Sequence, residues 1–589
     1  MKQLHRCVSP ICAAVLSALA LNSHAALYEV IELTVSEEGE VHTYALDGTS
    51  PRSDTGVVVG AGSPIPVFND NDLDPEDDEN YPVSPAPDNS NLGEFDLNGD
   101  GDEEDIVDEI EDADLRFMSA YQSKYKALIN DSLNEWDRIN VWDTINPEDG
   151  EYRETTDDYF FGVNDKRVAT GYGSSPYYVY KWEDEDTHDE TYAILRDFAS
   201  RAFVYKAGDD PDGERVALYP EEMEFGGVSG AYDISDSNLV AGYASVSLAT
   251  GAREAHDSCL YDRNLPEVVC DYEANSGQIG LSVYNIEAFI WQLNSDQEVV
   301  FTRALGSPIE LPAGVDARLV SQAFAANDNG YVVGSADNYV TPDAPSLQLL
   351  REYAAIYTEY SPNDVGILDI TDRDVYQANS DSPVVSRATG LNNNDIAIGF
   401  ATRLVNGFWR TKAWYYDINA DLPQMVEVPS FFDSSSMTAK SINDHDMIVG
   451  EFEWEPRPGN VTRRRHGYLY DIRSETFIDL NDAVGCISDL DIVEANVIRN
   501  DGVILATATT QMPLLTVDGD PVFDSNGDPI TTTVARAVAL KPIDGGDYDN
   551  CTDKDEAFPK NEREGAGFGW WLAALPIAVW FRRRYSISR

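Results

Sequence analysis

The chain has 589 residues, 105 of them Asp or Glu and 41 Lys or Arg, which gives a formal net charge of −64 at pH 7. A protein with this much negative charge repels nucleic acid and anionic membrane surfaces. Both are therefore excluded as partners on electrostatic grounds. Aromatic residues make up 11% of the chain, which is ample for a large core. The length allows several domains, although a repeat array can form one large unit.

Residues 1–25 have the pattern of a secretory signal peptide. Lys2 and Arg6 precede an apolar stretch at 11–21, and Ser23-His24-Ala25 forms a small-x-small cleavage site. The mature chain is therefore expected to begin at Ala26 and to be exported. The following residues, LYEVIELTV at 27–35, predict a strand. In a closed ring this strand would complete the last repeat unit, which removes an exposed sheet edge; the alternative is an ordinary strand of the first unit.

An acidic insertion is predicted at 69–140. Between residues 70 and 114, 20 of 45 residues are acidic and none is basic. Asp96, Asn98, Asp100 and Gly101 have the spacing that begins an EF-hand-type Ca²⁺ loop, in which oxygen ligands alternate and a Gly permits the turn. Position twelve is Val107 in place of the usual Glu, so a plain acidic linker is the alternative. The candidate Ca²⁺ ligands are Asp96, Asn98, Asp100, Asp102, Glu104, Asp105 and Asp108.

The insertion is predicted to continue as a helix over about 104–136, because apolar residues from Met118 to Trp136 recur at spacings of three and four. We expect this helix to pack on the repeat domain, with a ligand-gating lid as the alternative.

A polar turn leading into a short apolar strand recurs seven times. The copies are SDTGVVVG (53–60), NDKRVATG (164–171), SDSNLVAG (235–242), NDNGYVVG (327–334), NNNDIAIG (392–399), NDHDMIVG (443–450) and RNDGVILA (499–506). Asn, Asp and Gly tolerate positive φ and build tight turns, and the final Gly suits close approach of another backbone. The predicted structural residues are Ser53, Asn164, Ser235, Asn327, Asn392 and Asn443 in the turns, with Gly60, Gly171, Gly242, Gly334, Gly399 and Gly450 ending the strands.

A second element follows each of the last six copies after 14 to 46 residues. Its members are RAFVY (201–205), EAFIW (287–291), YAAIY (353–357), KAWYY (412–416), HGYLY (466–470) and RAVAL (536–540). We interpret this element as the second strand of each unit, with the turn beginning the unit. The connecting loop varies in length on a constant core, and such loops commonly carry binding function.

These paired elements resemble the HAF-type extracellular repeat over roughly residues 26–541. The resemblance implies a secreted β-repeat protein and assigns no catalytic residue. The leading residues Ser53, Ser235 and Arg499 depart from the Asn of that pattern.

Four cysteines remain after signal removal: Cys259, Cys270, Cys486 and Cys551. An even count in an exported protein favours disulfides, with Cys259–Cys270 and Cys486–Cys551 as the pairs we expect and buried free thiols as the alternative.

The chain ends with a polar linker at 546–564 and a tail at 565–589. The tail has a Gly-rich entry, an apolar run at 568–581, which is short for a membrane helix, and three Arg residues. It resembles GlyGly-CTERM sorting signals, which imply a processing protease and delivery to the cell surface or medium. A permanent C-terminal membrane anchor on a periplasmic protein is the alternative.

No catalytic motif stands out. GVSGA at 227–231 lacks the last Gly of a nucleophile elbow and precedes a repeat turn. The predicted fold is an all-β, seven-bladed β-propeller at 26–545, with six blades as the alternative geometry. The predicted function is a non-enzymatic, exported binding or structural protein that contacts an extracellular ligand or protein through its variable loops, with no cofactor other than Ca²⁺. A secreted carboxylate-dependent glycan hydrolase or lyase is the alternative.

Overall fold

The computed structural model of the protein describes most of residues 27–546. Outside this description lie residues 1–26, 36–40, 49–56, 65–124, 131–134, 146–151, 153–154, 184–189, 207–214, 277–282, 310–318, 341–349, 362–363, 379–383, 456–462, 485–489, 515–520, 524–526, 528, 544 and 547–589. The predicted signal peptide, Ca²⁺ ligands, C-terminal tail, Ser53, Cys486 and Cys551 all fall there, so those predictions stay predictions.

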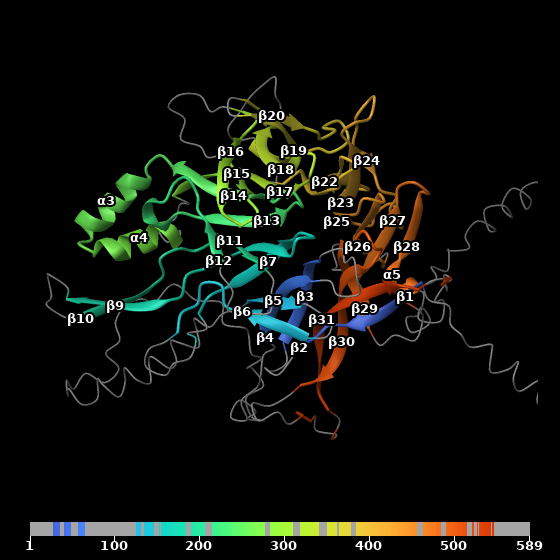
Figure 1. Cartoon of the computed structure of the whole chain (residues 1–589), viewed down its shortest axis with the longest axis horizontal. Helices are drawn as coiled ribbons and strands as arrows, with labels where there is room; N and C mark the ends of the chain where they lie inside the picture. Colours follow the sequence, from blue (N-terminus) through green and yellow to red (C-terminus); the bar gives the residue numbers. More distant parts are fainter. Residues whose placement is uncertain are drawn as a thin grey trace, which may run out of the picture.

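Seven antiparallel sheets form the blades of a β-propeller (Figure 1), which confirms the predicted fold class and its seven units. Blades 1 to 3 are β3 (Val41–Gly48), β4 (Val58–Pro64), β5 (Lys126–Asn130) and β6 (Glu135–Ile139); β7 (Asp158–Val163), β8 (Val168–Gly173), β11 (Arg201–Lys206) and β12 (Arg215–Leu218); and β13 (Ser229–Ile234), β14 (Leu239–Leu248), β15 (Tyr284–Leu293) and β16 (Val299–Gly306). Blades 4 and 5 are β17 (Ser321–Ala326), β18 (Val332–Tyr339), β19 (Leu350–Ser361) and β20 (Asp364–Asp369); and β21 (Ser386–Leu391), β22 (Ile396–Val405), β23 (Phe408–Asp417) and β24 (Val426–Glu427). Blades 6 and 7 are β25 (Met437–Ile442), β26 (Met447–Glu453), β27 (Arg465–Asp471) and β28 (Thr476–Asp479); and β29 (Asp491–Ile498), β30 (Ile504–Pro513), β31 (Thr531–Pro542) and β1 (Tyr28–Glu32).

Each repeat turn joins the first, innermost strand of a blade to the second strand. In blade 6 the turn at 443–446 connects β25 to β26, and the later HGYLY element lies in β27. The prediction that this second element forms the second strand is therefore wrong. The element forms the third strand of its blade, because the prediction overlooked the inner strand that precedes the turn. The variable loops connect second strands to third strands, so they lie at the opposite face of the propeller from the repeat turns.

The final Gly of the motif sits opposite a β-bulge in the innermost strand. In blade 5 the pairing register shifts between Ala388 and Gly390, directly beside the Ala388–Gly399 pair. A Cβ built on Gly399 would stand 1.9 Å from the carbonyl oxygen of Arg387. The bulge presses the inner strand onto its neighbour, so only a residue without a side chain fits.

Strand β1 closes the ring. It pairs antiparallel with β31 from Tyr28–Pro542 to Glu32–Val538, so blade 7 contains both the first and the last described strands of the chain. This confirms the predicted use of residues 27–35. The alternative is realised too, since β2 (Thr34–Val35) pairs with β6 in blade 1.

Hydrophobic clusters fill the seams, by which we mean the boundaries between neighbouring blades. Between blades 2 and 3, for example, Val204 packs in one cluster with Phe289 and Trp291, all fully buried. A polar contact recurs at four seams: the backbone N–H of the Ala in the second repeated element donates to a hydroxyl at the start of the next inner strand. The pairs are Ala202 to Ser229, Ala288 to Ser321, Ala354 to Ser386 and Ala537 to Thr43, at 2.8 to 3.0 Å.

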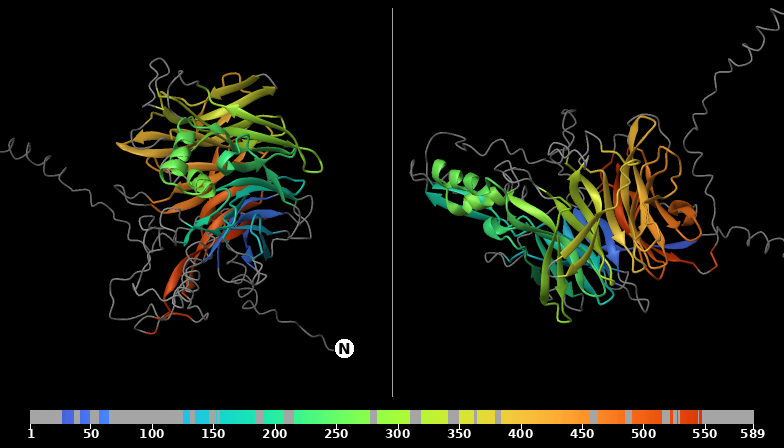
Figure 2. Two further views of the ribbon diagram at one scale, coloured as in Figure 1. Left: turned by 90° about the vertical axis from the view of Figure 1, so that its left-hand side faces the viewer. Right: turned by 90° about the horizontal axis from the view of Figure 1, so that it is seen from above.

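Two appendages lie outside the ring, at the left of Figure 1 and at the left of the right-hand view in Figure 2. One is the hairpin of β9 (Tyr178–Glu183) and β10 (Glu190–Leu195); the other is the pair α3 (Ala252–Asp262) and α4 (Glu267–Ser276), joined by a disulfide between Cys259 and Cys270. The short helices η2 (Glu224–Gly226) and α5 (Leu480–Ala483) complete the described elements.

The helix predicted at 104–136 is wrong in its last part, because residues 126–130 and 135–139 form β5 and β6 of blade 1. These strands are needed to complete a blade, and that tertiary requirement outweighs the helical spacing of the apolar residues. Within the described ranges, none of the helices has the length and hydropathy needed to cross a membrane.

Candidate functional site

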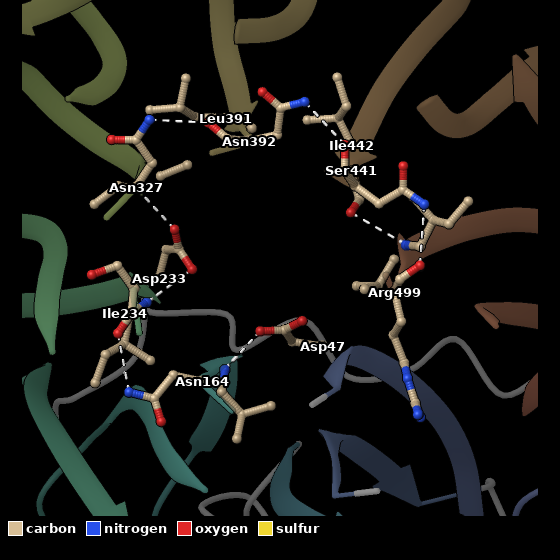
Figure 3. Close-up of a pocket in the computed structure, with 18 of the residues that line it drawn as sticks. Asp47, Asn164, Asp233, Ile234, Asn327, Leu391, Asn392, Ser441, Ile442 and Arg499 are labelled. Carbon is tan, nitrogen blue, oxygen red and sulfur yellow. Dashed lines mark hydrogen bonds between the residues drawn. The ribbon is translucent and has the colours of Figure 1, made fainter. Parts of the chain in front are cut away.

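A central pocket of about 270 Å³ opens on the face that carries the repeat turns, and the inner strands of all seven blades line it (Figure 3). Each blade contributes a short run that starts at its β-bulge and, in blades 2 to 7, ends in its repeat turn. The pocket thus has a floor formed by the bulge residues, a wall formed by the residues that follow them, and a rim formed by the residues of the repeat turns.

The bulge in each inner strand places one extra side chain on the pocket floor. These seven floor residues are Leu46, Phe161, Tyr232, Phe324, Thr389, Lys440 and Asn496. A bulge adds an unpaired residue and changes the direction of its side chain. The seven floor side chains can therefore point toward the propeller axis without disturbing the seam residues on either side.

Three neighbouring floor residues form an aromatic sector across blades 2 to 4. The ring centroid of Tyr232 lies 5.5 Å from that of Phe161 and 5.1 Å from that of Phe324. Tyr172 stacks on Phe161 at 5.3 Å and extends this sector along β8. Such offset and edge-on arrangements present both ring faces and ring edges to a neighbour.

Two carboxylates lie in the wall, one residue beyond the floor, and both bridge seams. Asp47 accepts a hydrogen bond from the backbone N–H of Val163 in blade 2 at 2.6 Å, and Asp233 accepts one from Ala326 in blade 4 at 2.9 Å. Burial, reinforced by the charge of Asp233, raises the pKa of Asp47 to about 8, and burial raises the pKa of Asp233 to about 6.

The leading Asn residues of four repeat turns form a hydrogen-bonded belt that links blade 2 to blade 3 and joins blades 4 to 7 in succession. Asn327 donates to the carbonyl of Asn392 at 3.0 Å, Asn392 donates to Asn443 at 3.0 Å, and Asn443 donates to Arg499 at 3.1 Å. Asn164 likewise donates to Ser235 at 3.0 Å. Each motif Asn therefore joins its blade to the next one.

The second residues of the turns make a parallel set of links and form the rim. The side chain of Asp444, for example, accepts from the backbone N–H of Asn393 at 2.9 Å. The rim residues are Asp165, Asp236, Asp328, Asn393, Asp444 and Asn500. Repulsion between these acids contributes to a raised pKa of Asp236, behind the larger effect of its burial.

Lys440 and Arg499, the two basic residues among the described lining residues, are both paired. Lys440 contacts the carboxylate of Glu494, and Arg499 bonds to Asp501 at 2.7 Å. Six acidic side chains line the described part of the same pocket, those of Asp47, Asp165, Asp233, Asp236, Asp328 and Asp444. Asp47, whose pKa is about 8, is mostly uncharged at neutral pH, but the other five still outnumber the two basic residues. The pocket is therefore negative in character.

The predicted turn residues Asn164, Ser235, Asn327, Asn392 and Asn443 all line this pocket, together with Arg499. The predicted glycines lie on the second strands behind the inner ring, and Cys259 and Cys270 lie in the helical appendage. No cluster of three His, Cys, Asp or Glu side chains suited to a metal ion occurs among the residues that the structure describes.

Sequence reasoning missed the floor residues and the two wall carboxylates. A positional signal for the floor exists, because in blades 2 to 7 each floor residue stands three positions before the leading residue of its repeat turn, as Tyr232 does before Ser235. In blade 1 the spacing from Leu46 to Ser53 is seven, so the rule weakens there.

Comparisons with known proteins identify the family of the chain. Similar solved structures include a polysaccharide lyase, "PL25-Ulvanlyase", with a TM-score of 0.33 and 8% identity over 91% of this chain and 99% of that chain. Another is an unknown-function protein from Dyadobacter fermentans, with a TM-score of 0.31 and 9% identity over 88% and 100% of the two chains. At these TM-scores the likeness carries no argument about fold or function. No curated protein matches the sequence. A family model matches residues 5–584, and the chain belongs to that family, described as "Protein of unknown function (DUF3466)".

Proposed function

We propose that this protein is an exported, non-enzymatic binding protein whose central pocket takes a small organic cation, such as a quaternary ammonium or an amine. The observation that carries the proposal is the combination of an aromatic floor sector with a carboxylate rim in one pocket.

Charge is the first argument. Among the described lining residues, acidic side chains outnumber the two basic ones, Lys440 and Arg499, and each basic side chain pairs with a carboxylate. A cation is attracted to such a site before it makes any contact, and an anion is repelled.

The aromatic sector is the second argument. The faces of Phe and Tyr attract cations, and recognition of quaternary ammonium groups by aromatic residues is a recurrent use of this attraction. Phe161, Tyr232 and Phe324 belong to three successive blades. The guanidinium of Arg387 already lies over the Phe324 ring, 5.3 Å from its centroid, so a ligand resting on the floor would contact Phe161 and Tyr232. The volume of 270 Å³ suits a small ligand.

The pocket favours binding over hydrolysis. Asp47 and Asp233 each accept two backbone N–H bonds, Asp47 from Val163 and Gly48, and Asp233 from Ala326 and Ile234. Carboxylates used in this way support the fold rather than transfer protons to a substrate. An acidic polysaccharide, moreover, would meet like charges at the rim.

Export to the cell surface or medium belongs to the proposal. It rests on the sequence of residues 1–25 and on the tail at 565–589. The disulfide between Cys259 and Cys270 is consistent with an oxidising compartment. The acidic stretch with Asp96, Asn98 and Asp100 is proposed to bind Ca²⁺ independently of the pocket.

Isothermal titration of the purified protein with choline, with its uncharged isostere 3,3-dimethylbutanol and with glucuronate tests the ligand class. We expect choline alone to bind, with an affinity that falls as salt is added. Equal binding of the uncharged isostere, or preferential binding of glucuronate, would overturn the proposal.

Two variants localise the binding. Asp236→Asn removes a rim charge and keeps the oxygen that accepts from Asp165, so we expect weaker choline binding with an unchanged unfolding midpoint. Asp421→Asn, at an exposed side chain absent from the pocket lining, is the matched control for the loss of one charge and should bind normally.

A further inference from the structure

Lys440, Glu494 and Asn496 meet at the seam between blades 6 and 7. The ammonium nitrogen of Lys440 contacts the carboxylate of Glu494 and lies 3.3 Å from the amide oxygen of Asn496. Lys440 and Asn496 are the floor residues of adjacent inner strands, β25 and β29, separated by 56 positions in sequence. An amine, a carboxamide and a carboxylic acid are thus brought together by the ring itself.

The carboxamide of Asn496 is held in one orientation. Its nitrogen donates to the carbonyl of Ala45 in blade 1 at 2.9 Å and to the hydroxyl of Thr507 at 3.0 Å. Its oxygen therefore faces Lys440, and its NH₂ group lies beside Thr507, the residue that pairs with Glu494 between β29 and β30. Asn496 is only 8% exposed, so few water molecules compete for the amide carbon.

The Lys440 amine is prepared for nucleophilic attack. Burial lowers its pKa to about 8, with a further contribution from Arg465 and an opposing one from Glu451. A lowered pKa increases the unprotonated fraction of this amine at neutral pH relative to that of an ordinary lysine, and the adjacent carboxylate of Glu494 is placed to take up the proton. A desolvated lysine is a recognised way to make this amine nucleophilic.

We propose that Lys440 and Asn496 form an intramolecular isopeptide bond, with Glu494 as the proton carrier. The amine nitrogen attacks the amide carbon of Asn496, Glu494 takes a proton from that nitrogen and delivers it to the departing NH₂ group, and ammonia leaves as the C–N bond breaks. One amine and one primary amide become one secondary amide and ammonia. The step requires no oxidant, reductant or other reactant.

The bond would join the inner strands of the last two blades covalently. A cross-link between residues 56 positions apart restricts the unfolded chain, so the linked protein should resist unfolding more than the unlinked one. This inference is independent of the cation-binding proposal, since the two make different measurable claims.

Peptide mapping of the full chain by mass spectrometry tests the bond. Trypsin does not cut at an acylated lysine, so we expect a branched product in which residues 413–463 are joined to residues 474–499, about 17 Da lighter than the sum of the two peptides because ammonia is lost. Separate, unmodified peptides from folded protein would overturn the proposal. A loss of about 18 Da would also overturn it, because water is lost only if Glu494 is the acyl partner.

Variants provide the controls. Asn496→Ala should abolish the branched product, and Glu494→Gln should abolish or greatly slow its formation while circular dichroism shows an unchanged β-structure. Lys412 is the internal control: it is fully buried and its amine donates to Ser430 and to the carbonyls of Asp433 and Ser435. No carboxamide is among those partners, so normal tryptic cleavage after Lys412 is expected.

Discussion

The side-chain amide of Asn392 donates a 3.0 Å hydrogen bond to the backbone carbonyl of Asn443, the residue that occupies the same motif position in the next blade. Its amide oxygen meanwhile accepts from the backbone N–H of Ile396 at 2.9 Å, within its own turn. One side chain therefore closes a turn and fastens that turn to its neighbour. The same two contacts are made by Asn164, Asn327 and Asn443, which explains why Asn recurs at the head of these turns.

Replacing Asn392 with Ala should destabilise the protein by about 3 kcal/mol, because buried donors and acceptors in two blades lose their partners at once. Urea unfolding followed by tryptophan fluorescence measures the change. Asn406→Gly is the control, since Asn406 lies in the exposed turn between β22 and β23 with φ of 52°, which Gly adopts readily. Equal effects of the two substitutions would contradict the role of the belt.

Ser235→Asn should stabilise the protein by about 1 kcal/mol. Ser235 occupies the leading position in blade 3, where its hydroxyl accepts from the N–H of Leu239 at 3.3 Å. Serine has no side-chain amide, so this residue cannot reach blade 4 as Asn reaches the next blade elsewhere. An Asn at this position adds a donor directed at the carbonyl of Asn327. Differential scanning calorimetry should show a higher unfolding temperature; a lower one would mean that this seam is too narrow for the amide.

Gly399→Ala should destabilise the protein by about 3 kcal/mol or more, because the added methyl group meets the Arg387 carbonyl at 1.9 Å and the Trp414 ring at 2.6 Å. Soluble yield and thermal unfolding report the effect. Gly407→Ala is the matched control: nothing lies within 4 Å of its added Cβ, and only the strain of φ +85° opposes it, at about 1 kcal/mol.

Stability should fall as the pH rises from 5 to 8. The pKa of Asp47 is about 8 in the folded protein, above the value of 3.8 for the free side chain, so the folded state binds the proton more tightly than the unfolded state does. The stabilisation from this proton is complete below pH 4 and is lost as the pH rises toward 8, at no more than about 1.4 kcal/mol per pH unit.

Asp47→Asn tests the assignment of this pH dependence. The variant carries no titrating group at the position and should show a flatter urea-midpoint profile between pH 5 and 8 than the wild-type protein. An unchanged slope would assign the dependence to other groups, and a slope of the opposite sign would contradict the raised pKa itself.

Much of the ring is predictable from the sequence because the motif carries its own physical requirements. Asn at the head of the turn and Gly opposite the bulge are demanded by contacts that recur from blade to blade, so seven copies predict seven blades. The closing strand is predictable as well, because a ring of sheets needs an edge partner for β31.

The wrong helix prediction in blade 1 arose because apolar residues there have helical spacing, which competed with the repeat pattern. Lys126-Ala127-Leu128-Ile129 has the same polar–Ala–apolar pattern as RAFVY, and it forms the third strand β5. The floor residues of the pocket could not be predicted from the sequence for a different reason. A bulge depends on pairing with another strand, and single-strand alternation does not reveal which residue is pushed toward the axis.

The pairing of Val30 with Leu540 brings together residues about 510 positions apart. Such non-local pairings slow folding, because the chain loses loop-closure entropy before the contact forms. Until that moment β31 presents an unsatisfied edge to any passing polypeptide. The slowest and most aggregation-exposed stage of maturation should therefore be the docking of β1, and a peptide with the sequence LYEVIELTV added during refolding should compete for that edge and lower the yield of closed rings.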